Sequence, residues 1–252
     1  MALEDRQERY LRNLAIPGFG ARGQELLAGS QVLVVGLGGL GSPAAYYLAA
    51  AGVGTLGLLD SDVVEESNLQ RQVLHGTADI GRRKADSAAE AIAALDPEIR
   101  VERIYDRLTA QNARDLIEPF DAVVEATDSF AAKYLINDTC VELKKPFATA
   151  GVLELSGQAQ FIVPSETACL RCVAPDAPEK PDGAAGVLGA AAGVLGSLEA
   201  MEVIRWLAGL WKPQPDGAAL LHSLDGECMR LKTLRVLPQR GCSCGVWSDN
   251  DR

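Results

Sequence analysis

The chain has 252 residues, of which 48% are hydrophobic and 23% are charged, and its formal net charge is −10. This length suffices for one large α/β domain, and the acidic balance argues against the broad basic surface that general nucleic-acid binding needs. No segment is long and apolar enough to cross a membrane, and residues 1–6 lack a signal-peptide core. We therefore expect a cytoplasmic protein with no membrane and no nucleic-acid partner.

The first thirty residues predict a helical arm that precedes the core of the protein. Two short helices, over residues 5–14 and 21–27, are separated by the helix-breaking pair Pro17-Gly18. The first of these helices is rich in arginine and includes Arg12.

Short apolar runs alternate with Ala-rich helical stretches over residues 31–163. This alternation predicts an α/β fold with a doubly wound, largely parallel, Rossmann-like sheet. The predicted strands are residues 31–35, 55–60, 99–105, 122–126, 147–151 and 158–163. The predicted helices are residues 42–51, 85–95, 111–117 and 130–143.

The composition changes over residues 164–252. Residues 174–186 are rich in Pro and Gly, which predicts a mobile loop. A long buried helix is predicted over residues 188–210, and two antiparallel strands are predicted within residues 218–237. We interpret residues 1–252 as a single domain made of the arm (1–30), the core (31–163) and this C-terminal extension.

A glycine motif lies where the first predicted strand meets the first predicted core helix. Gly36, Gly38 and Gly41 fit the G-x-G-x-x-G pattern, in which backbone and helix N-terminus accommodate a phosphate. Asp60 ends the next strand, where an acid would bond the hydroxyls of a ribose. The pattern predicts a nucleotide with an adenosine end and fits NAD as well as ATP.

Further charged residues distinguish between these nucleotides. Arg71 and Lys84 would offset the charge of a triphosphate, although they could also be solvated surface charges. Asp128 follows an apolar strand at the edge of the sheet where such folds bind ligands. It could bind Mg²⁺, cap the following helix, or do both.

These residues together resemble the ubiquitin-activating enzyme superfamily. More narrowly, the chain is similar to the bacterial ThiF/MoeB/HesA adenylyltransferases that activate sulfur-carrier proteins, above all to the molybdopterin-synthase branch. The resemblance covers nearly the whole chain, and several independent motifs occur in order. The matching motifs are Gly36-Leu-Gly-Gly-Leu-Gly41, Asp60-x-Asp62, Ser67-Asn68-Leu69-x-Arg71-Gln72, Lys84 and Thr127-Asp128-x-Phe130.

The resemblance implies a role for each matching position. Asp128 would bind Mg²⁺ and orient the α-phosphate, and Arg12 would reach the ATP of a partner subunit in a homodimer. The implied catalytic residues are Arg12, Arg71, Lys84 and Asp128. The implied nucleotide-binding residues are Gly36, Gly38, Gly39, Gly41, Asp60, Asp62, Asn68, Arg71 and Lys84.

The resemblance also implies the reaction. The C-terminal Gly-Gly carboxylate of a small ubiquitin-like sulfur carrier would attack the α-phosphate of ATP, and pyrophosphate would leave. A sulfur donor would then convert the acyl-adenylate to a thiocarboxylate. We recognise no sulfurtransferase domain after the adenylyltransferase domain, so we expect the donor to be a separate protein.

Four cysteines form two close pairs, C-x-x-C and C-x-C, which predict a structural zinc site. The resembling enzymes normally have C-x-x-C in both halves, so the second pair here is one residue short. Reduced thiols or a labile disulfide are the alternatives, Cys228 is an unsuitable ligand, and Cys140 is interpreted as a buried helical residue. The predicted zinc ligands are Cys169, Cys172, Cys242 and Cys244.

A second departure concerns the predicted loop. Thiamine-type members often have a cysteine before Ala-Gly-Val that can join the carrier covalently, whereas this chain has Asp182 at that position. We therefore expect an enzyme that adenylylates without a covalent carrier intermediate on this loop.

Two other functions compete with this interpretation. A nicotinamide-dependent oxidoreductase would use the same glycine turn, but it would have no evident use for Arg71, Lys84 and Asp128. A non-catalytic module that binds a ubiquitin-like partner is compatible with the altered cysteines. Such a module would not need the catalytic residues, however, and this chain keeps each of them. We interpret both histidines, His75 and His222, as structural or solvated.

Overall fold

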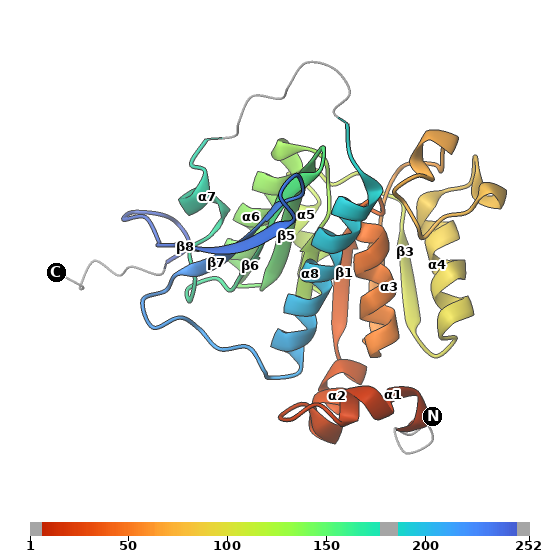
Figure 1. Ribbon diagram of the computed structural model, residues 1–252, viewed down its shortest axis with the longest axis horizontal. Coiled ribbons are helices and arrows are strands. Elements are labelled where there is room, and N and C mark those ends of the chain that lie inside the picture. The colour runs from red at the N-terminus through yellow and green to blue at the C-terminus, as the bar shows by residue number, and fades with distance from the viewer. Residues whose placement is uncertain (1–6, 177–185, 246–252) are drawn as a thin grey trace.

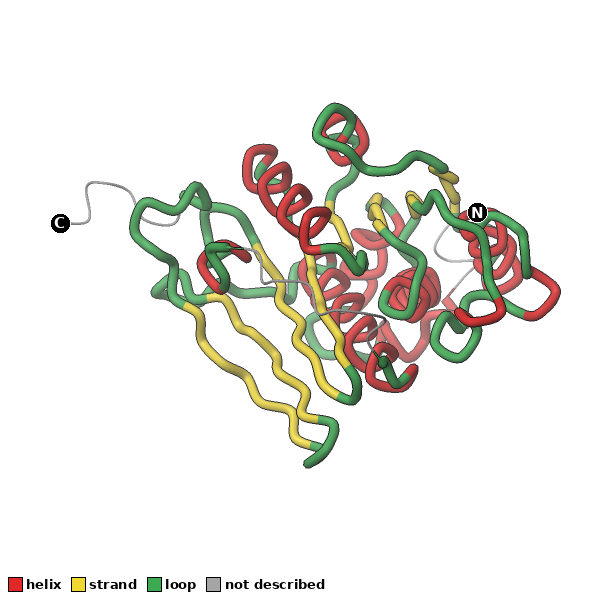
Figure 2. The backbone as a smooth tube through the Cα atoms, turned by 90° about the horizontal axis from the view of Figure 1, so that it is seen from above, coloured by secondary structure: helices red, strands yellow, loops and turns green. Residues whose placement is uncertain are grey.

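The computed structural model describes residues 7–176 and 186–245. They form an eight-stranded sheet in the order β3-β2-β1-β4-β5-β6-β7-β8, with helices on both of its faces (Figures 1 and 2). Neighbouring strands from β3 to β5 are parallel, and those from β5 to β8 are antiparallel. The predicted doubly wound sheet with an antiparallel C-terminal extension is confirmed.

The strands follow the predicted apolar runs closely. Their bounds are β1 Gln31–Val35, β2 Thr55–Leu59, β3 Arg100–Ile104, β4 Ala122–Glu125, β5 Phe147–Leu153, β6 Ser156–Ile162, β7 Ala219–Asp225 and β8 Arg230–Val236. The α-helices are α1 Gln7–Leu14, α2 Gly20–Ala28, α3 Gly41–Ala51, α4 Lys84–Leu95, α5 Ala113–Ile117, α6 Phe130–Leu143, α7 Leu170–Val173 and α8 Gly189–Leu207. Two single-turn 3₁₀ helices are η2 Glu66–Asn68 and η3 Thr77–Asp79.

Some boundaries differ from the prediction for local reasons. Helix α8 ends at Leu207 instead of residue 210, because Gly209 adopts a φ of 74° that ends the helix. The single turns α7, η2 and η3 were not predicted, since one turn has no periodicity to detect. Most of the predicted mobile loop, including Asp182, lies outside the described residues.

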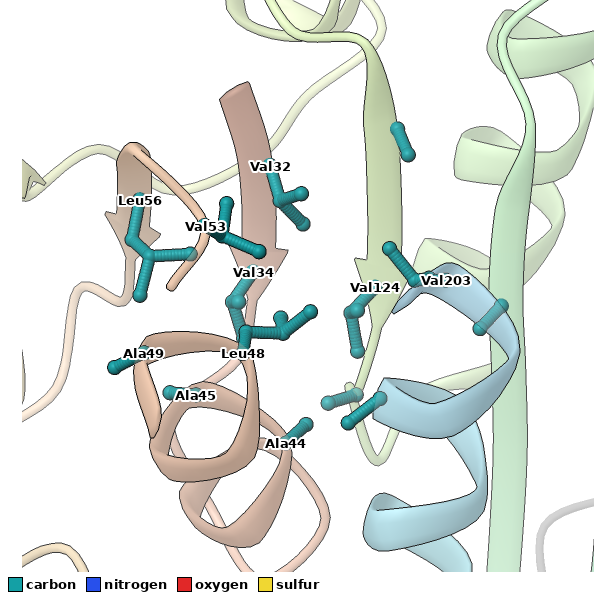
Figure 3. Packing of buried hydrophobic residues seen from close by; sticks show 14 of the residues in the cluster. Val32, Val34, Ala44, Ala45, Leu48, Ala49, Val53, Leu56, Val124 and Val203 are labelled. Atoms are coloured by element: carbon teal, nitrogen blue, oxygen red, sulfur yellow. The ribbon is translucent and has the colours of Figure 1, made fainter. Parts of the chain in front are cut away.

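Small side chains bring the helices close to the sheet. Ala44, Ala45 and Ala49 of α3 pack over Val32 and Val34 of β1 (Figure 3). The alanine-rich composition of these helices is therefore a packing feature, because short side chains let a helix axis approach the strands.

Helix α8 lies directly against the start of α3. A Cβ atom at Gly196 would be 2.1 Å from the carbonyl oxygen of Leu40, so only glycine permits this approach. Helices α3, α4 and α8 cover one face of the sheet, and α5 and α6 cover the other. None of the described helices combines the length and the continuous hydrophobicity of a membrane-crossing segment.

The face of α8 that meets the sheet carries a buried acid, Glu199, which is 1% exposed. Neither of its carboxylate oxygens has a hydrogen-bond partner among the described residues. Burial raises the pKa of Glu199 well above its ordinary value, and the charge of Glu125 adds to this effect. Burial therefore favours the neutral, protonated form of Glu199 in the folded protein relative to the unfolded chain.

This burial predicts a pH-dependent stability difference between wild type and Glu199→Gln. Above the unfolded-state pKa, the folded state keeps the Glu199 proton while the unfolded chain loses it. The free energy of unfolding of the wild type therefore falls by about 1.4 kcal/mol per pH unit until the pH reaches the folded-state pKa. The melting temperature of Glu199→Gln relative to wild type should therefore rise as the pH is raised above the ordinary pKa of a glutamate. Glu227→Gln, at an exposed turn residue, is the control. A pH-independent difference would contradict the neutral state of Glu199.

Candidate functional site

The glycine turn lies at the carboxyl end of β1, between the ends of β2 and β4. Gly36 has a φ of 91°, and a Cβ atom there would be 2.7 Å from the carbonyl oxygen of Ala126. A Cβ atom at Gly41 would be 1.9 Å from the carbonyl oxygen of Gly36. Both positions require glycine for steric reasons, and the turn passes directly over the end of β4.

Asp60 directly follows β2 and holds this turn. One of its carboxylate oxygens accepts the N–H of Leu37 at 2.8 Å, and the other accepts the N–H of Asp62 at 2.8 Å. Asp60 is only 9% exposed. The sequence predicted a ligand to ribose here, and the structure adds that Asp60 fixes the backbone around the glycines.

Lys84 is the first residue of α4 and lies beside these acids. Its Nζ is 3.2 Å from Asp62 Oδ2 and 4.0 Å from Asp60 Oδ2, and the residue is only 6% exposed. A cavity of about 220 Å³ opens next to this group. Its lining residues are Asp62, Val63, Glu65, Asn68 and Lys84. The lysine is a fixed cation at a cavity, which excludes the alternative of a solvated surface charge.

Arg71 lies over the glycine turn. A Cβ atom at Gly39 would be 3.4 Å from Arg71 Cγ, and the guanidinium donates to the carbonyl oxygen of Ser67 at 3.0 Å. Gln72, the next residue, is buried with its Oε1 unpaired among the described residues, and its Nε2 faces Gly38. The sequence analysis assigned Gln72 no role, although it belongs to the motif of Asn68 and Arg71.

Asp128 is exposed just after β4, on the other side of the glycine turn. A Cβ atom at Gly36 would be 3.3 Å from the N–H nitrogen of Thr127, which places the turn that carries Asp128 next to Gly36. The structure thus brings Asp60, Lys84 and Asp128 to one edge of the sheet. This is the topological switch point, where β1 has β2 on one side and β4 on the other.

Arg12 does not join this cluster. Its neighbour Asn13 contacts the carbonyl oxygen of Ala51 at 3.5 Å, and Ala51 ends α3. The glycine turn begins α3, so a helix about 15 Å long separates it from the surface around Arg12. Arg12 is exposed there, at the opposite end of the strands from its own glycine turn (Figure 1).

His75 is buried in the core beneath the glycine turn. Its Nε2 is 3.1 Å from the carbonyl oxygen of Leu37, which can only accept, so Nε2 carries the proton. Its Nδ1 accepts from the hydroxyl of Ser87 at 2.9 Å, and burial lowers the pKa of the ring. The predicted structural role of His75 is confirmed, because it ties the turn to α4. His222 likewise pairs with Thr233 and Glu202.

The sequence analysis missed two residues near Asp128, namely Glu125 and Lys133. Glu125 is fully buried at the end of β4, and Lys133 lies 2.7 Å from it on α6. An acid inside an otherwise apolar strand was the available signal, because a buried carboxylate requires a partner.

The four cysteines form a second cluster at the far end of the sheet. Their sulfur atoms all lie within 4.8 Å of one another, with 3.5 Å between Cys169 and Cys242 and 3.7 Å between Cys172 and Cys244. Tetrahedral zinc with Zn–S bonds of about 2.3 Å requires sulfur atoms about 3.8 Å apart. The set fits zinc, and the short C-x-C pair still brings both sulfur atoms into place.

The environment of this cluster also favours a metal. The backbone N–H of Gln239 donates to the sulfur of Cys172 at 3.3 Å, which stabilises a thiolate there. The thiolate is the form that binds zinc. Cys140 is fully buried on α6 and Cys228 is exposed, so neither belongs to the cluster, as predicted.

The chain is similar in sequence to known proteins. The sequence model of the ThiF family matches residues 10–246. The probable adenylyltransferase/sulfurtransferase MoeZ of Mycobacterium tuberculosis is 52% identical over 151 residues, which are 60% of this chain and 38% of MoeZ. The adenylyltransferase and sulfurtransferase MOCS3 of Anopheles gambiae is 44% identical over 171 residues, which are 68% of this chain and 39% of MOCS3. The chain thus spans well under half the length of these curated relatives.

Solved structures show the same fold. The structure of E. coli MccB with ATP has a TM-score of 0.82 at 24% identity, covering 94% of this chain and 74% of MccB. The structure of PaaA has a TM-score of 0.77 at 23% identity, covering 95% of this chain and 76% of PaaA.

We expect Gly41 and Gly38 of the turn to respond differently to substitution by alanine. Gly41→Ala places a methyl group against a backbone carbonyl, so we expect a lower melting temperature. Gly38→Ala meets only Gln72 Nε2 at 3.7 Å, so it should fold normally. Its methyl group would occupy the place where a phosphate approaches, and we expect about tenfold weaker Mg·ATP binding in calorimetry. Unchanged ATP affinity in Gly38→Ala would contradict the placement of the phosphates.

The cysteine cluster predicts a coupled loss of metal and stability. Cys172→Ala removes one ligand, so zinc content measured by elemental analysis and melting temperature should fall together. Cys228→Ala is the matched control and should retain both wild-type values. A wild-type protein that lacks zinc and whose melting temperature is unaffected by a chelator would refute the site.

Proposed function

The chain belongs to the ThiF family, and on that premise we propose that it is an ATP-dependent adenylyltransferase for a carrier protein. Its substrate is the C-terminal Gly-Gly carboxylate of a small ubiquitin-like sulfur carrier, and pyrophosphate is the leaving group. The acyl-adenylate then precedes thiocarboxylate formation.

The convergence at the switch point carries this proposal. Asp60, Lys84 and Arg71 come from separate segments after β2, and Asp128 comes from the end of β4, yet all of them border the glycine turn. An adenosine end requires an acid and a glycine turn, whereas a triphosphate additionally requires fixed cations. A nicotinamide enzyme would not require the cations.

The reaction needs positioning and charge neutralisation from this chain, without a covalent nucleophile on the enzyme. The carrier carboxylate oxygen bonds to the α-phosphorus, and the bond to the β-phosphate oxygen breaks with its electron pair leaving on pyrophosphate. Lys84 and Arg71 offset the charge that gathers on the phosphate oxygens, and Asn68 donates to them. Asp60 holds the ribose and keeps the turn in place.

Asp128 is the proposed magnesium ligand. Its carboxylate is exposed at the edge of the sheet, and hard oxygen ligands suit Mg²⁺. The metal would supply charge neutralisation at the phosphates.

The names of relatives support a protein substrate. MoeZ and MOCS3 are named adenylyltransferase and sulfurtransferase, and MccB has been solved with ATP and with MccA. We propose by analogy that this chain adenylylates a carrier terminus.

A homodimer is part of the proposal. Arg12 lies at the opposite end of the strands from its own site, so it could contact a phosphate only in another copy of the chain. We therefore propose that each subunit donates Arg12 to the ATP of its partner.

The assignment of Asp128 predicts the effect of its removal. Asp128→Ala should fold like wild type, because the side chain is exposed, and should lose at least about 100-fold in carrier-dependent pyrophosphate–ATP exchange. The control Asp115→Ala changes an exposed acid on α5 and should exchange at the wild-type rate. Exchange at the wild-type rate in Asp128→Ala would remove this residue from the site. A wild-type protein that binds ATP but never exchanges would instead favour a binding module.

A further inference from the structure

Glu125 is a buried charge with an unusual division of hydrogen bonds. It is the last residue of β4 and is fully buried. Its Oε1 accepts the backbone N–H of Thr127 at 2.9 Å and the hydroxyl of Thr127 at 2.6 Å. Its Oε2 accepts Lys133 Nζ at 2.7 Å and the hydroxyl of Thr149 at 2.5 Å. One oxygen thus holds the turn after β4, and the other is anchored in the core.

The anchored side of this arrangement connects three elements. Lys133 lies on α6, is 8% exposed, and also donates to the carbonyl oxygen of Ala150 on β5 at 2.5 Å. Thr149 is the cross-strand neighbour of Glu125 in the β4–β5 pair. The position of the Glu125 carboxylate is therefore fixed by α6 and β5 together. A buried ion pair contributes little net stability, so its geometric role is the more informative property.

The residue that follows this anchored turn is Asp128. Among the described residues, no hydrogen bond or ion pair restrains its carboxylate, and its side chain is exposed. The position of that carboxylate is therefore set by the backbone of the turn. The only side chain that accepts the N–H of Thr127 in the described structure is Glu125.

We propose that Glu125 is a positioning residue for Asp128, with Lys133 and Thr149 as its anchor. The proposal rests on the proposed role of Asp128 in binding magnesium and the α-phosphate. Glu125 does not contact the nucleotide, because it is fully buried. It holds the turn so that the Asp128 carboxylate meets the metal and the phosphate in one place, and displacements of about 1 Å in such groups cost up to about 100-fold in rate.

The test uses variants that change one side of the arrangement at a time. Thr127→Val removes one hydroxyl donor to Oε1, on the side of the turn. Thr149→Val removes one hydroxyl donor to Oε2 and so weakens the anchor. Thr139→Val is the matched control, because the Thr139 hydroxyl donates to the carbonyl oxygen of Leu135 and not to Glu125. Glu125→Gln keeps the shape of the side chain and loses its charge.

Two readouts separate positioning from structural support. The first is the hydrogen-exchange rate of the Thr127 and Asp128 amides, which needs no ligand and no activity. The second is functional and has two parts. One is the magnesium concentration that gives half-maximal ATP binding in calorimetry, and the other is kcat for pyrophosphate exchange. We expect Glu125→Gln and Thr127→Val to speed amide exchange at the turn, to raise that magnesium concentration about fivefold or more, and to lower kcat about tenfold or more. Thr149→Val should shift these values in the same direction, and Thr139→Val should change stability alone.

Each alternative outcome is distinguishable. If Glu125→Gln lowers the melting temperature but leaves turn exchange, magnesium dependence and kcat at wild-type values, the positioning role is wrong. If Glu125→Gln does not fold, Thr127→Val and its control decide by the same criteria. If wild type binds Mg·ATP but shows no pyrophosphate exchange, adenylylation fails while the turn and magnesium readouts still decide the role of Glu125. If ATP binding does not depend on magnesium in wild type, the inference falls with the assignment of Asp128.

Discussion

The close approach of the glycine turn to the end of β4 is the constraint on which the site depends. Because β1 pairs in parallel with both β2 and β4, the turn that leaves β1 must pass between the segments that leave its two neighbours. Gly36 and Gly41 permit that passage, since a Cβ atom at either would meet a backbone carbonyl. The N-terminus of α3 is thereby held at the edge of the sheet, where its free N–H groups are available to a phosphate.

Two buried ion pairs flank this turn, and they are arranged alike. On one side of the turn, Asp60 directly follows β2 and pairs with Lys84 at the start of α4. On the other side, Glu125 ends β4 and pairs with Lys133 in the first turns of α6. In each pair the acid accepts a backbone N–H of the segment after its strand, from Asp62 and from Thr127 respectively. Buried pairs of this kind are weak sources of stability. Their consistent feature here is that each one fixes a loop at the ligand-binding edge.

Much of this could be predicted from the sequence, because the decisive signals are local. The strand–turn–helix pattern predicted the fold. The glycines and Asp60 predicted that a nucleotide binds at this edge of the sheet. Both predictions depend on residues that lie near one another in the chain. Glu125 was missed because its partner Thr149 lies 24 residues further on, and only the register of β4 with β5 brings them together. The prediction of the cysteine cluster did not depend on how the strands pair, because the spacing within each of the two cysteine pairs already indicates a metal site. The roles assigned by resemblance, above all that of Arg12, stay predictions.

The central claim is that the carboxylate of a carrier terminus attacks the α-phosphate of ATP, and intact-mass spectrometry of the carrier tests it most directly. A small ubiquitin-like carrier ending in Gly-Gly would be incubated with this protein and Mg·ATP, and its mass then measured with and without hydroxylamine. The account predicts a carrier that gains one AMP moiety on its C-terminal glycine and loses it to hydroxylamine, because an acyl-adenylate is a reactive mixed anhydride. A carrier of unchanged mass despite ATP bound to the protein, or AMP attached at another residue, would contradict it.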